Sequence, residues 1–320
     1  MAYKVLIPQD IAKEGKQYLI DRGYEIMMGS GITVEDIKKD VKDCDAILAR
    51  TASFPREVFE AGKKLKVIAR HGVAYDNVDI DAATDLGIYV TNAPLSNANS
   101  VAEQAIGFII ALAKNTVFCD KELRKGNFEI RNQLHGIELE GKILGLIGLG
   151  KIGNAVAQKS TYGLGMKVIA YDPYVKQENV DSYIKLVEDL DEIFKNADFI
   201  SLHLPLTDKT RRMVGREKLQ MMKTTAYLIN TSRGNVVNEK ELIVALKEGQ
   251  LAGAGLDVYE QEPPENNNEL FSLDNVVVTP HNSSHTKEAT QRMAIHAAMG
   301  IDEVLSGEIP SWPVNKPIIR

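Results

Sequence analysis

The sequence predicts an α/β protein built from two doubly wound, parallel-sheet domains. Three observations support this prediction. Short apolar runs recur along the 320 residues, helix-length segments separate most of them, and a glycine-rich turn, GLIGLGKIGN at 145–154, follows one such run near the middle of the chain. Continuous apolar strands that alternate with helices are typical of parallel sheets covered on both faces.

The composition narrows the class of protein. The chain is 44% hydrophobic and 26% charged, and its net charge of −6 comes without a lysine/arginine block, which argues against a nucleic-acid partner. Cys44 and Cys119 match no metal-ligand spacing and indicate reduced thiols. The start, MAYKVLIPQD, is a strand pattern and not a signal peptide, and the longest apolar stretch, 105–113, is too short to span a membrane. We therefore expect a cytoplasmic protein with no metal and no membrane partner.

Apolar runs place the strands in two groups. The first group predicts strands at 4–7, 25–28, 46–49, 66–69 and 88–91. The second predicts strands at 143–148, 167–171, 199–204, 226–230, 254–258 and 276–279. In dinucleotide-binding folds the glycine-rich turn follows the first strand of the sheet, so the second group predicts a cofactor domain that begins shortly before residue 143.

The chain after residue 279 is too short for a third domain. It is expected to form one helix, ended by Gly307, that packs back onto the first domain. We therefore predict a discontinuous, flavodoxin-like substrate domain of residues 1–99 and 287–320. A Rossmann NAD-binding domain, residues 100–286, is inserted into it.

The glycine-rich turn predicts a phosphate-binding site. Gly148, Gly150 and Gly153 form G-x-G-x-x-G between a strand and a helical pattern. In that setting the three glycines permit the tight turn, the approach of a pyrophosphate and the packing of helix on strand, and the helix offers free N–H groups. Asp172 ends the next strand, 19 residues after Gly153, where its carboxylate can bind a ribose diol and repel a 2′-phosphate. The motif therefore predicts NAD and not NADP; the alternative is a glycine turn that binds nothing.

Three later strand ends carry candidate catalytic side chains. They are Arg233 in NTSRGNVVN, Asp257 and Glu262 in GLDVYEQEPP, and His281 in VVTPHNSSH. Ligands of open α/β sheets bind outside the carboxyl ends of the strands. A guanidinium suits a carboxylate ligand, and an imidazole suits proton transfer near neutral pH.

Together with ARHGVAYDNVD at 69–79 and NSVAEQAIGFIIAL at 99–112, these motifs resemble the D-isomer-specific 2-hydroxyacid dehydrogenase family over essentially the whole chain. The resemblance implies an NAD-dependent enzyme that interconverts a small 2-oxoacid and its D-2-hydroxyacid by hydride transfer. It implies that Arg233 binds the substrate carboxylate and polarises the keto oxygen, and that His281 protonates that oxygen. Glu262 would stand behind the imidazole and favour its charged form.

The resemblance also implies the remaining contacts. The further cofactor-binding residues would be Lys151 and Ile152 at the pyrophosphate, His203 and Pro205 toward the adenine, and Thr231, Ser232 and Asp257 at the nicotinamide. Backbone N–H groups of Val73 and Ala74 would hold the substrate carboxylate. Arg50 and Arg131 resemble the positions at which phosphoglycerate dehydrogenases place phosphate-binding arginines.

Two departures from the family pattern bear on the choice of substrate. The family often has a glycine where Ala74 stands, and an alanine there narrows the loop or forbids a positive φ. It commonly has a glycine soon after the catalytic histidine, where this chain has Asn282, Ser283 and Ser284. Both departures leave the reaction type in place.

Other functions and the assembly state remain open at this point. The first alternative is D-3-phosphoglycerate dehydrogenase of serine synthesis, and the second is an NAD-dependent, corepressor-like binding module. A formate- or phosphite-type dehydrogenase is a third, although the extra segments expected for it are not evident. The mostly apolar helix expected at 100–114 is either core or interface, and the resemblance implies a homodimer.

Overall fold

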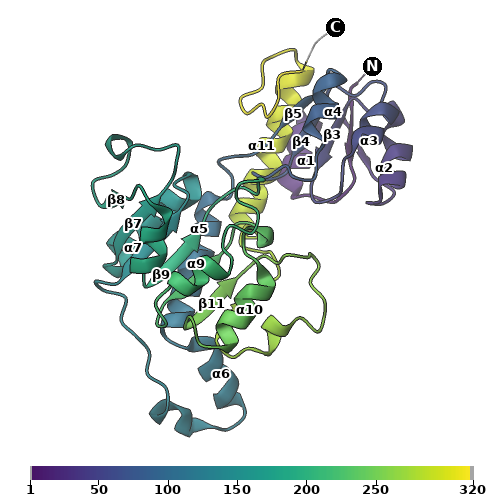
Figure 1. Ribbon diagram of the computed structural model, residues 1–320. Helices are drawn as coiled ribbons and strands as arrows, with labels where there is room; N and C mark the ends of the chain where they lie inside the picture. The colour runs from purple at the N-terminus through teal and green to yellow at the C-terminus, as the bar shows by residue number, and fades with distance from the viewer. Residues whose placement is uncertain (1, 318–320) are drawn as a thin grey trace. The chain divides into compact units, whose positions relative to one another are not determined.

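The computed structural model describes residues 2–317, which form two compact units (Figure 1). Unit 1 consists of Met1–Asn97 and Ser284–Arg320, and unit 2 is the intervening Ala98–Ser283. The chain thus passes between the units within three residues of the expected boundaries. Residue 1 and residues 318–320 of the expected first domain lie outside the described residues.

Unit 1 contains a five-stranded parallel sheet of order β2-β1-β3-β4-β5. Its strands are β1 (Lys4–Ile7), β2 (Glu25–Met28), β3 (Ala46–Ala49), β4 (Val67–Arg70) and β5 (Tyr89–Thr91). Its helices are α1 (Lys13–Asp21), α2 (Val34–Asp40), α3 (Arg56–Ala61), α4 (Ile80–Asp85) and α11 (Lys287–Leu305), with a short η1 (Val41–Asp43). This strand order is that of flavodoxin-like folds, which confirms the expected class.

Helices cover both faces of this sheet because successive strand residues point to opposite sides. On β1, Val5 and Ile7 belong to the cluster shared with α1 and α11, whereas Leu6 packs on the opposite side with α2 and α3. The expected C-terminal helix is α11, which packs against α1, β3 and β4. The two helices approach closely where α1 carries Gly15: a Cβ there would lie 2.7 Å from the Cβ of Ala294.

Unit 2 contains a seven-stranded parallel sheet of order β12-β11-β10-β9-β6-β7-β8. Its strands are β6 (Ile143–Ile147), β7 (Lys167–Tyr171), β8 (Ile184–Leu186), β9 (Phe199–Leu202), β10 (Tyr227–Asn230), β11 (Gly253–Leu256) and β12 (Val276–Val278). From the β6–β9 junction the strand order proceeds outward through β7 and β8 on one side and through β10, β11 and β12 on the other, which is the Rossmann arrangement with one added strand. The sequence analysis did not predict β8.

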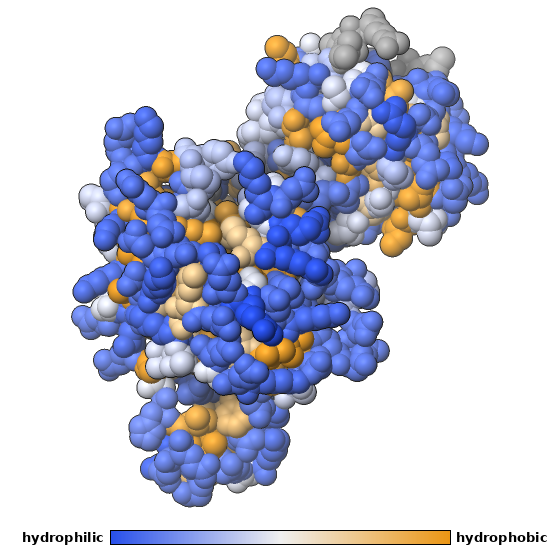
Figure 2. Space-filling view, in the orientation of Figure 1, coloured by the Kyte–Doolittle hydropathy of each residue, from blue (hydrophilic) through white to orange (hydrophobic). Residues whose placement is uncertain are grey.

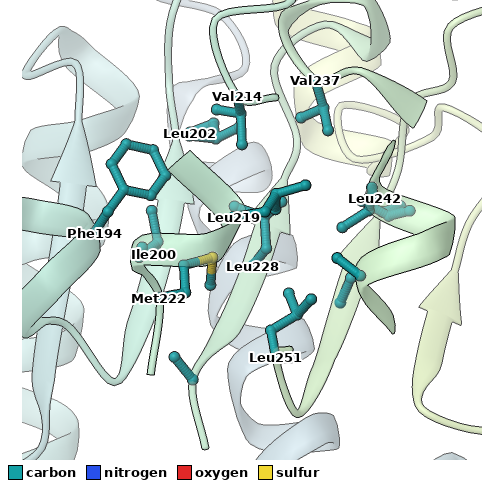
Figure 3. Packing of buried hydrophobic residues seen from close by; sticks show 14 of the residues in the cluster. Phe194, Ile200, Leu202, Val214, Leu219, Met222, Leu228, Val237, Leu242 and Leu251 are labelled. Atoms are coloured by element: carbon teal, nitrogen blue, oxygen red, sulfur yellow. The ribbon is translucent and has the colours of Figure 1, made fainter. Parts of the chain in front are cut away.

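The helices of unit 2 lie on both faces of its sheet. They are α5 (Ala98–Ala113), α6 (Thr116–Arg124), α7 (Lys151–Leu164), α8 (Leu190–Asn196), α9 (Arg216–Met221) and α10 (Glu239–Lys247), with η2 (Phe128–Asn132), η3 (Gln177–Asn179), η4 (Gly234–Val236) and η5 (Glu269–Ser272). One face packs Phe194, Ile200 and Leu228 with α8, α9 and α10 (Figure 3). The other packs Phe199 and Ile229 against α5 and α7.

The apolar helix α5 belongs to the core. Ala102, Ala105, Phe108, Ile109 and Leu112 are buried against α7, β10 and β11. The next helix, α6, has no buried residue and projects beyond the sheet of unit 2 (Figure 1). Among residues 2–317, no single helix is long and apolar enough to cross a membrane; α5 and α6, bent by 60°, reach that threshold only when counted together.

Candidate active site

The predicted cofactor and catalytic residues of unit 2 follow the carboxyl ends of its strands. Gly148 follows β6, Asp172 follows β7, His203 follows β9, and Thr231 follows β10. Asp257 comes directly after β11. Because all seven strands are parallel, these ends meet at one edge of the sheet, where open α/β folds bind their ligands.

The glycine-rich turn has the geometry of a phosphate cradle. Gly148 has a φ of +98°, and a Cβ on it would collide with the carbonyl oxygen of His203. A Cβ on Gly153 would collide with the carbonyl oxygen of Gly148, so the first turn of α7 lies directly on the loop. Gly150 is different, because its Cβ position has no heavy atom within 4 Å. The open space thus lies at the N-cap of α7, where the N–H groups of Lys151 and Ile152 begin the helix.

Asp172 joins this cradle to the next strand. Its Oδ2 accepts a hydrogen bond of 2.9 Å from the N–H of Leu149, and its Oδ1 accepts one of 2.9 Å from the N–H of Tyr174. Each carboxylate oxygen keeps a lone pair for a further donor. An open cavity of about 620 Å³ adjoins the carboxylate and is lined by residues that follow β7 and β8. The position fits a ribose hydroxyl pair.

Two further strand ends supply polar groups. Burial lowers the pKa of His203 to about 4, so the ring is neutral at pH 7, and its Nε2 lies 3.0 Å from Oγ of Ser201. Pro205 follows in the same loop. The hydroxyl of Thr231 is buried and has no hydrogen-bond partner within the described residues. Buried polar groups are nearly always paired, so this orphaned hydroxyl fits a site whose ligand supplies the partner.

Ser232 is already engaged within the protein. Its backbone N–H and its hydroxyl both donate to Oδ1 of Asn230, at 3.0 and 2.8 Å. The Asn230 amide donates in turn to the carbonyl oxygen of Arg233. These bonds fix the turn that presents Arg233.

His281 and Glu262 form a hydrogen-bonded pair. Nδ1 of His281 lies 2.6 Å from Oε2 of Glu262, and the side chains are 47% and 36% exposed. Burial opposes ionisation of Glu262, and hydrogen bonds from His281 and from the N–H of Tyr259 favour it. With the nearby charges of His281 and Arg233, they lower the pKa of the carboxyl. Glu262 is therefore ionised at neutral pH, with its carboxylate facing Nδ1 of His281.

Arg233 reaches the same place through a close backbone contact. A Cβ on the next residue, Gly234, would collide with the carbonyl oxygen of Tyr259. The turn after β10 therefore lies directly against the loop that carries Glu262. The Arg233 guanidinium donates 2.7 Å to the carbonyl oxygen of Ser232, and its charge acts on Glu262. Arg233, Glu262 and His281 thus come together from three separate strand ends.

Asp257 is buried behind His281, with 1% of the residue exposed. Its Oδ1 accepts from the Thr279 hydroxyl at 2.5 Å and from the N–H of Asn282 at 2.9 Å. Its Oδ2 accepts from the N–H of Ser283 at 3.0 Å and from the Ser283 hydroxyl. From the sequence, Thr279 was given no role, and Ser283 was noted only as part of the departure after the histidine; the signal was one hydroxyl residue two positions before His281 and another two after it.

The predicted substrate-binding residues are divided between the units. Arg50, Val73 and Ala74 lie in unit 1. There the Arg50 guanidinium donates a hydrogen bond of 2.6 Å to the carbonyl oxygen of Asp10. The carbonyl oxygen of Val73 accepts a hydrogen bond of 2.7 Å from the Asn92 amide. Ala74 is not among the described residues with positive φ, so the alanine fits its turn without strain.

Arg131 lies in unit 2 but on η2, at the projecting end with α6. The side chain is exposed, and its guanidinium lies 5.1 Å from the centre of the Phe128 ring. The element that carries Arg131, η2, packs against α6. The role of Arg131 at a phosphate stays a prediction.

Comparison with known sequences identifies the NAD-binding unit. Residues 106–283 match the sequence profile described as D-isomer specific 2-hydroxyacid dehydrogenase, NAD binding domain. A glyoxylate reductase of Korarchaeum cryptofilum is 41% identical over 285 residues, covering 88% of this chain and 85% of the relative. A D-3-phosphoglycerate dehydrogenase of Methanocaldococcus jannaschii is 42% identical over 318 residues, covering 99% of this chain but 60% of the relative. The chain therefore spans about three fifths of that relative's length.

Comparison with solved structures agrees over the whole chain. The TT0316 protein from Thermus thermophilus has a TM-score of 0.91 and 34% identity, covering 98% of this chain and 100% of that one. A D-lactate dehydrogenase with NAD⁺ from Lactobacillus jensenii has a TM-score of 0.83 and 30% identity, with the same coverage. The likeness extends over both units.

Proposed function

The chain belongs to the D-isomer-specific 2-hydroxyacid dehydrogenase family, and we propose that it interconverts a small, unphosphorylated 2-oxoacid and its D-2-hydroxyacid with NAD. Glyoxylate, hydroxypyruvate and pyruvate are the substrates of this size. One observation carries the proposal: Arg233 lies near the hydrogen-bonded pair of His281 and Glu262 at the carboxyl edge of the NAD-binding sheet. Within that pair, Nδ1 of His281 lies 2.6 Å from Oε2 of Glu262. Relatives named glyoxylate reductase and hydroxypyruvate reductase support it.

The bound nicotinamide supplies the hydride acceptor or donor. Arg233 binds the substrate carboxylate through its planar guanidinium and draws electron density from the keto oxygen. Because Nδ1 of His281 is engaged by Glu262, Nε2 is the nitrogen that holds the transferable proton. In reduction the imidazolium delivers this proton to the oxygen on C2, and in oxidation the neutral ring removes it. Ionised Glu262 stabilises the imidazolium.

Asp172 supports the preference for NAD over NADP. Its carboxylate is held at the end of β7 by the N–H groups of Leu149 and Tyr174. A ribose diol can donate to it, whereas a 2′-phosphate would be repelled. We expect kcat/KM to be higher with NADH than with NADPH.

The first experiment follows the oxidation of NADH at 340 nm with glyoxylate, hydroxypyruvate, pyruvate and 3-phosphohydroxypyruvate, and repeats the panel with NADPH. Turnover of the unphosphorylated acids supports the proposal. A strong preference for 3-phosphohydroxypyruvate would instead make the chain a phosphoglycerate dehydrogenase with Arg50 and Arg131 as phosphate ligands. Tight NADH binding without turnover would favour the corepressor-like binding module.

Phosphoglycerate dehydrogenase is the second candidate because a relative of that name is 42% identical over 99% of this chain. Arg50, which follows β3, has the chemistry for a phosphate. The same substrate panel separates the two candidates, since only the phosphorylated acid needs this arginine. An Arg50→Ala variant would then lose activity on 3-phosphohydroxypyruvate selectively.

We also propose that the chain forms a homodimer through its projecting end. Most of the apolar residues of α5 are packed in the core, whereas α6 and η2 carry exposed apolar side chains, among them Leu123, 56% exposed, and Phe128, 59% exposed. Figure 2 shows apolar residues gathered at this end of unit 2. Leu123→Glu should halve the mass measured by light scattering, whereas Val244→Glu, at an exposed position of α10, should not. Equal masses for both variants would exclude this surface.

A cytoplasmic location is also inferred. Cys44 and Cys119 are both free thiols, as expected in a reducing compartment. Cell fractionation with an antibody to the chain tests this inference.

A further inference from the structure

We propose that Ser283 is a positioning residue for His281, which it fixes by donating its hydroxyl to buried Asp257. This inference rests on the proposed function, because it assigns a role within the same site.

His281 adopts a left-handed backbone conformation, with φ of +50°. For a residue with a bulky side chain this conformation is costly, and it persists only where the surroundings over-determine it. The N–H of His281 donates to the carbonyl oxygens of Asp257, at 2.8 Å, and Thr279, at 3.1 Å. Hydrogen bonds from the residues before and after His281 are therefore needed to hold its backbone in this conformation.

Asp257 accepts hydrogen bonds from residues on both sides of His281. A buried carboxylate is tolerated only when its lone pairs are satisfied, and its two oxygens offer about four acceptor positions. Thr279 fills one from the side before His281, and Asn282 and Ser283 fill the others from the side after it. The carboxylate thus clamps the two ends of a five-residue segment that has the catalytic histidine at its centre.

Glu262 and Asp257 act on His281 in different ways. Glu262 touches the ring at Nδ1 and selects the tautomer. Asp257 has no recorded bond to the ring and acts on the backbone beneath it. Loss of the clamp should therefore change where the ring lies, without removing the carboxylate that favours its protonation.

The hydrogen bond from the Ser283 hydroxyl to Asp257 gives a structural role to one residue of the segment in which the family commonly has a glycine. With a glycine at 283, Oδ2 of Asp257 would receive only the backbone N–H. Ser283 is 5% exposed and directs its hydroxyl inward, so the larger residue adds a hydrogen bond at the clamp instead of bulk at the surface.

The test compares variants that remove one hydroxyl with variants that keep it. Ser283→Ala and Thr279→Val should lower kcat by about 10- to 100-fold, the size expected when a catalytic group is displaced, with KM for NADH changed less than twofold. Thr279→Ser keeps the hydroxyl and should restore kcat. Ser272→Ala is the matched control, since its hydroxyl bonds only to the carbonyl oxygen of Glu269 on an exposed turn.

A second readout makes the inference independent of turnover. The ring resonances of His281, assigned with His281→Asn, should shift or broaden in Ser283→Ala and Thr279→Val and remain unchanged in Thr279→Ser and Ser272→Ala. If the wild-type chain reduces none of the 2-oxoacids but these resonances respond, the proposed function fails and the positioning role stands. Unchanged resonances together with unchanged kcat in both hydroxyl-deleting variants would overturn the inference.

Discussion

Nδ1 of His281 lies 2.6 Å from Oε2 of Glu262, so the imidazole and the carboxylate behave as one unit. In the proposed mechanism this bond leaves Nε2 of His281 for the substrate. The low pKa of Glu262 means that the carboxylate keeps its charge while the histidine gains and loses a proton.

Replacing either member of this pair should separate the proton donor from its support. His281→Ala should lower kcat by about 10²- to 10⁴-fold, the usual contribution of a general acid. Glu262→Gln keeps a hydrogen-bond acceptor but removes the charge, so the loss should be smaller. A His281→Ala enzyme with nearly normal kcat would exclude this donor.

Arg233 should contribute to both binding and rate. Arg233→Ala removes the group proposed to bind the carboxylate and polarise the keto oxygen, so kcat/KM should fall on the order of 10³-fold. Arg233→Lys restores the charge but not the planar fork, and should recover only part of the loss. Steady-state kinetics with saturating NADH measure this, with exposed Arg216→Ala as the control. Comparable losses in Arg216→Ala would point to a general effect of charge.

Alanine substitution should weaken NADH binding at Gly153 of α7 but not at Gly163 of the same helix. On Gly153 of α7 the new methyl group would collide with the carbonyl oxygen of Gly148 and displace the phosphate-binding loop. Gly163 has no atom within 4 Å of its Cβ position, so alanine there should raise stability by about 0.4–1 kcal/mol. Fluorescence titration with NADH should show weaker binding only for Gly153→Ala. Equal binding by both variants would show that the close approach is unnecessary.

His71 should make unit 1 sensitive to acid. Burial, aided by the charges of Arg50 and Arg70, lowers its pKa from 6.5 to about 4, and the residue is 7% exposed. Between pH 6.5 and 4, His71 is protonated in the unfolded chain but neutral in the folded chain. The free energy of unfolding therefore falls as the pH drops toward 4. The loss should be on the order of 2 kcal/mol by pH 5.

The measurement compares thermal unfolding at pH 7 and pH 5. His71→Gln should lose less stability than wild type over this interval, whereas exposed His135→Gln should match wild type. The same pH dependence in both variants would mean that the ring of His71 accepts a proton within the folded chain.

The fold was readable from the sequence because most of the parallel strands are continuous apolar runs. The same rule explains the failure at β8. Its three residues place Lys185 between Ile184 and Leu186 at the edge of the sheet, so the run is too short and too polar to be recognised.

The candidate site was predictable only in part. Arg233, Glu262 and His281 were found because each follows a strand and carries reactive chemistry. The clamp around Asp257 was not, since hydrogen bonds from Thr279 and Ser283 exist only once the turn has closed. For Arg131 the family resemblance implied a phosphate ligand, and the sequence alone could not show that the residue lies on η2 beside α6.

The late position of α11 in the chain has a consequence for synthesis. One face of the first sheet, with Val5, Leu48 and Val67, is completed by Ala294 and Ile301 of α11. At about 5–20 residues per second, a ribosome needs roughly 10 to 40 s to pass from Asn97 to Lys287. For that time the nascent chain presents an unfinished apolar surface to chaperones. The unit whose translation starts first is thus the last to acquire its full core.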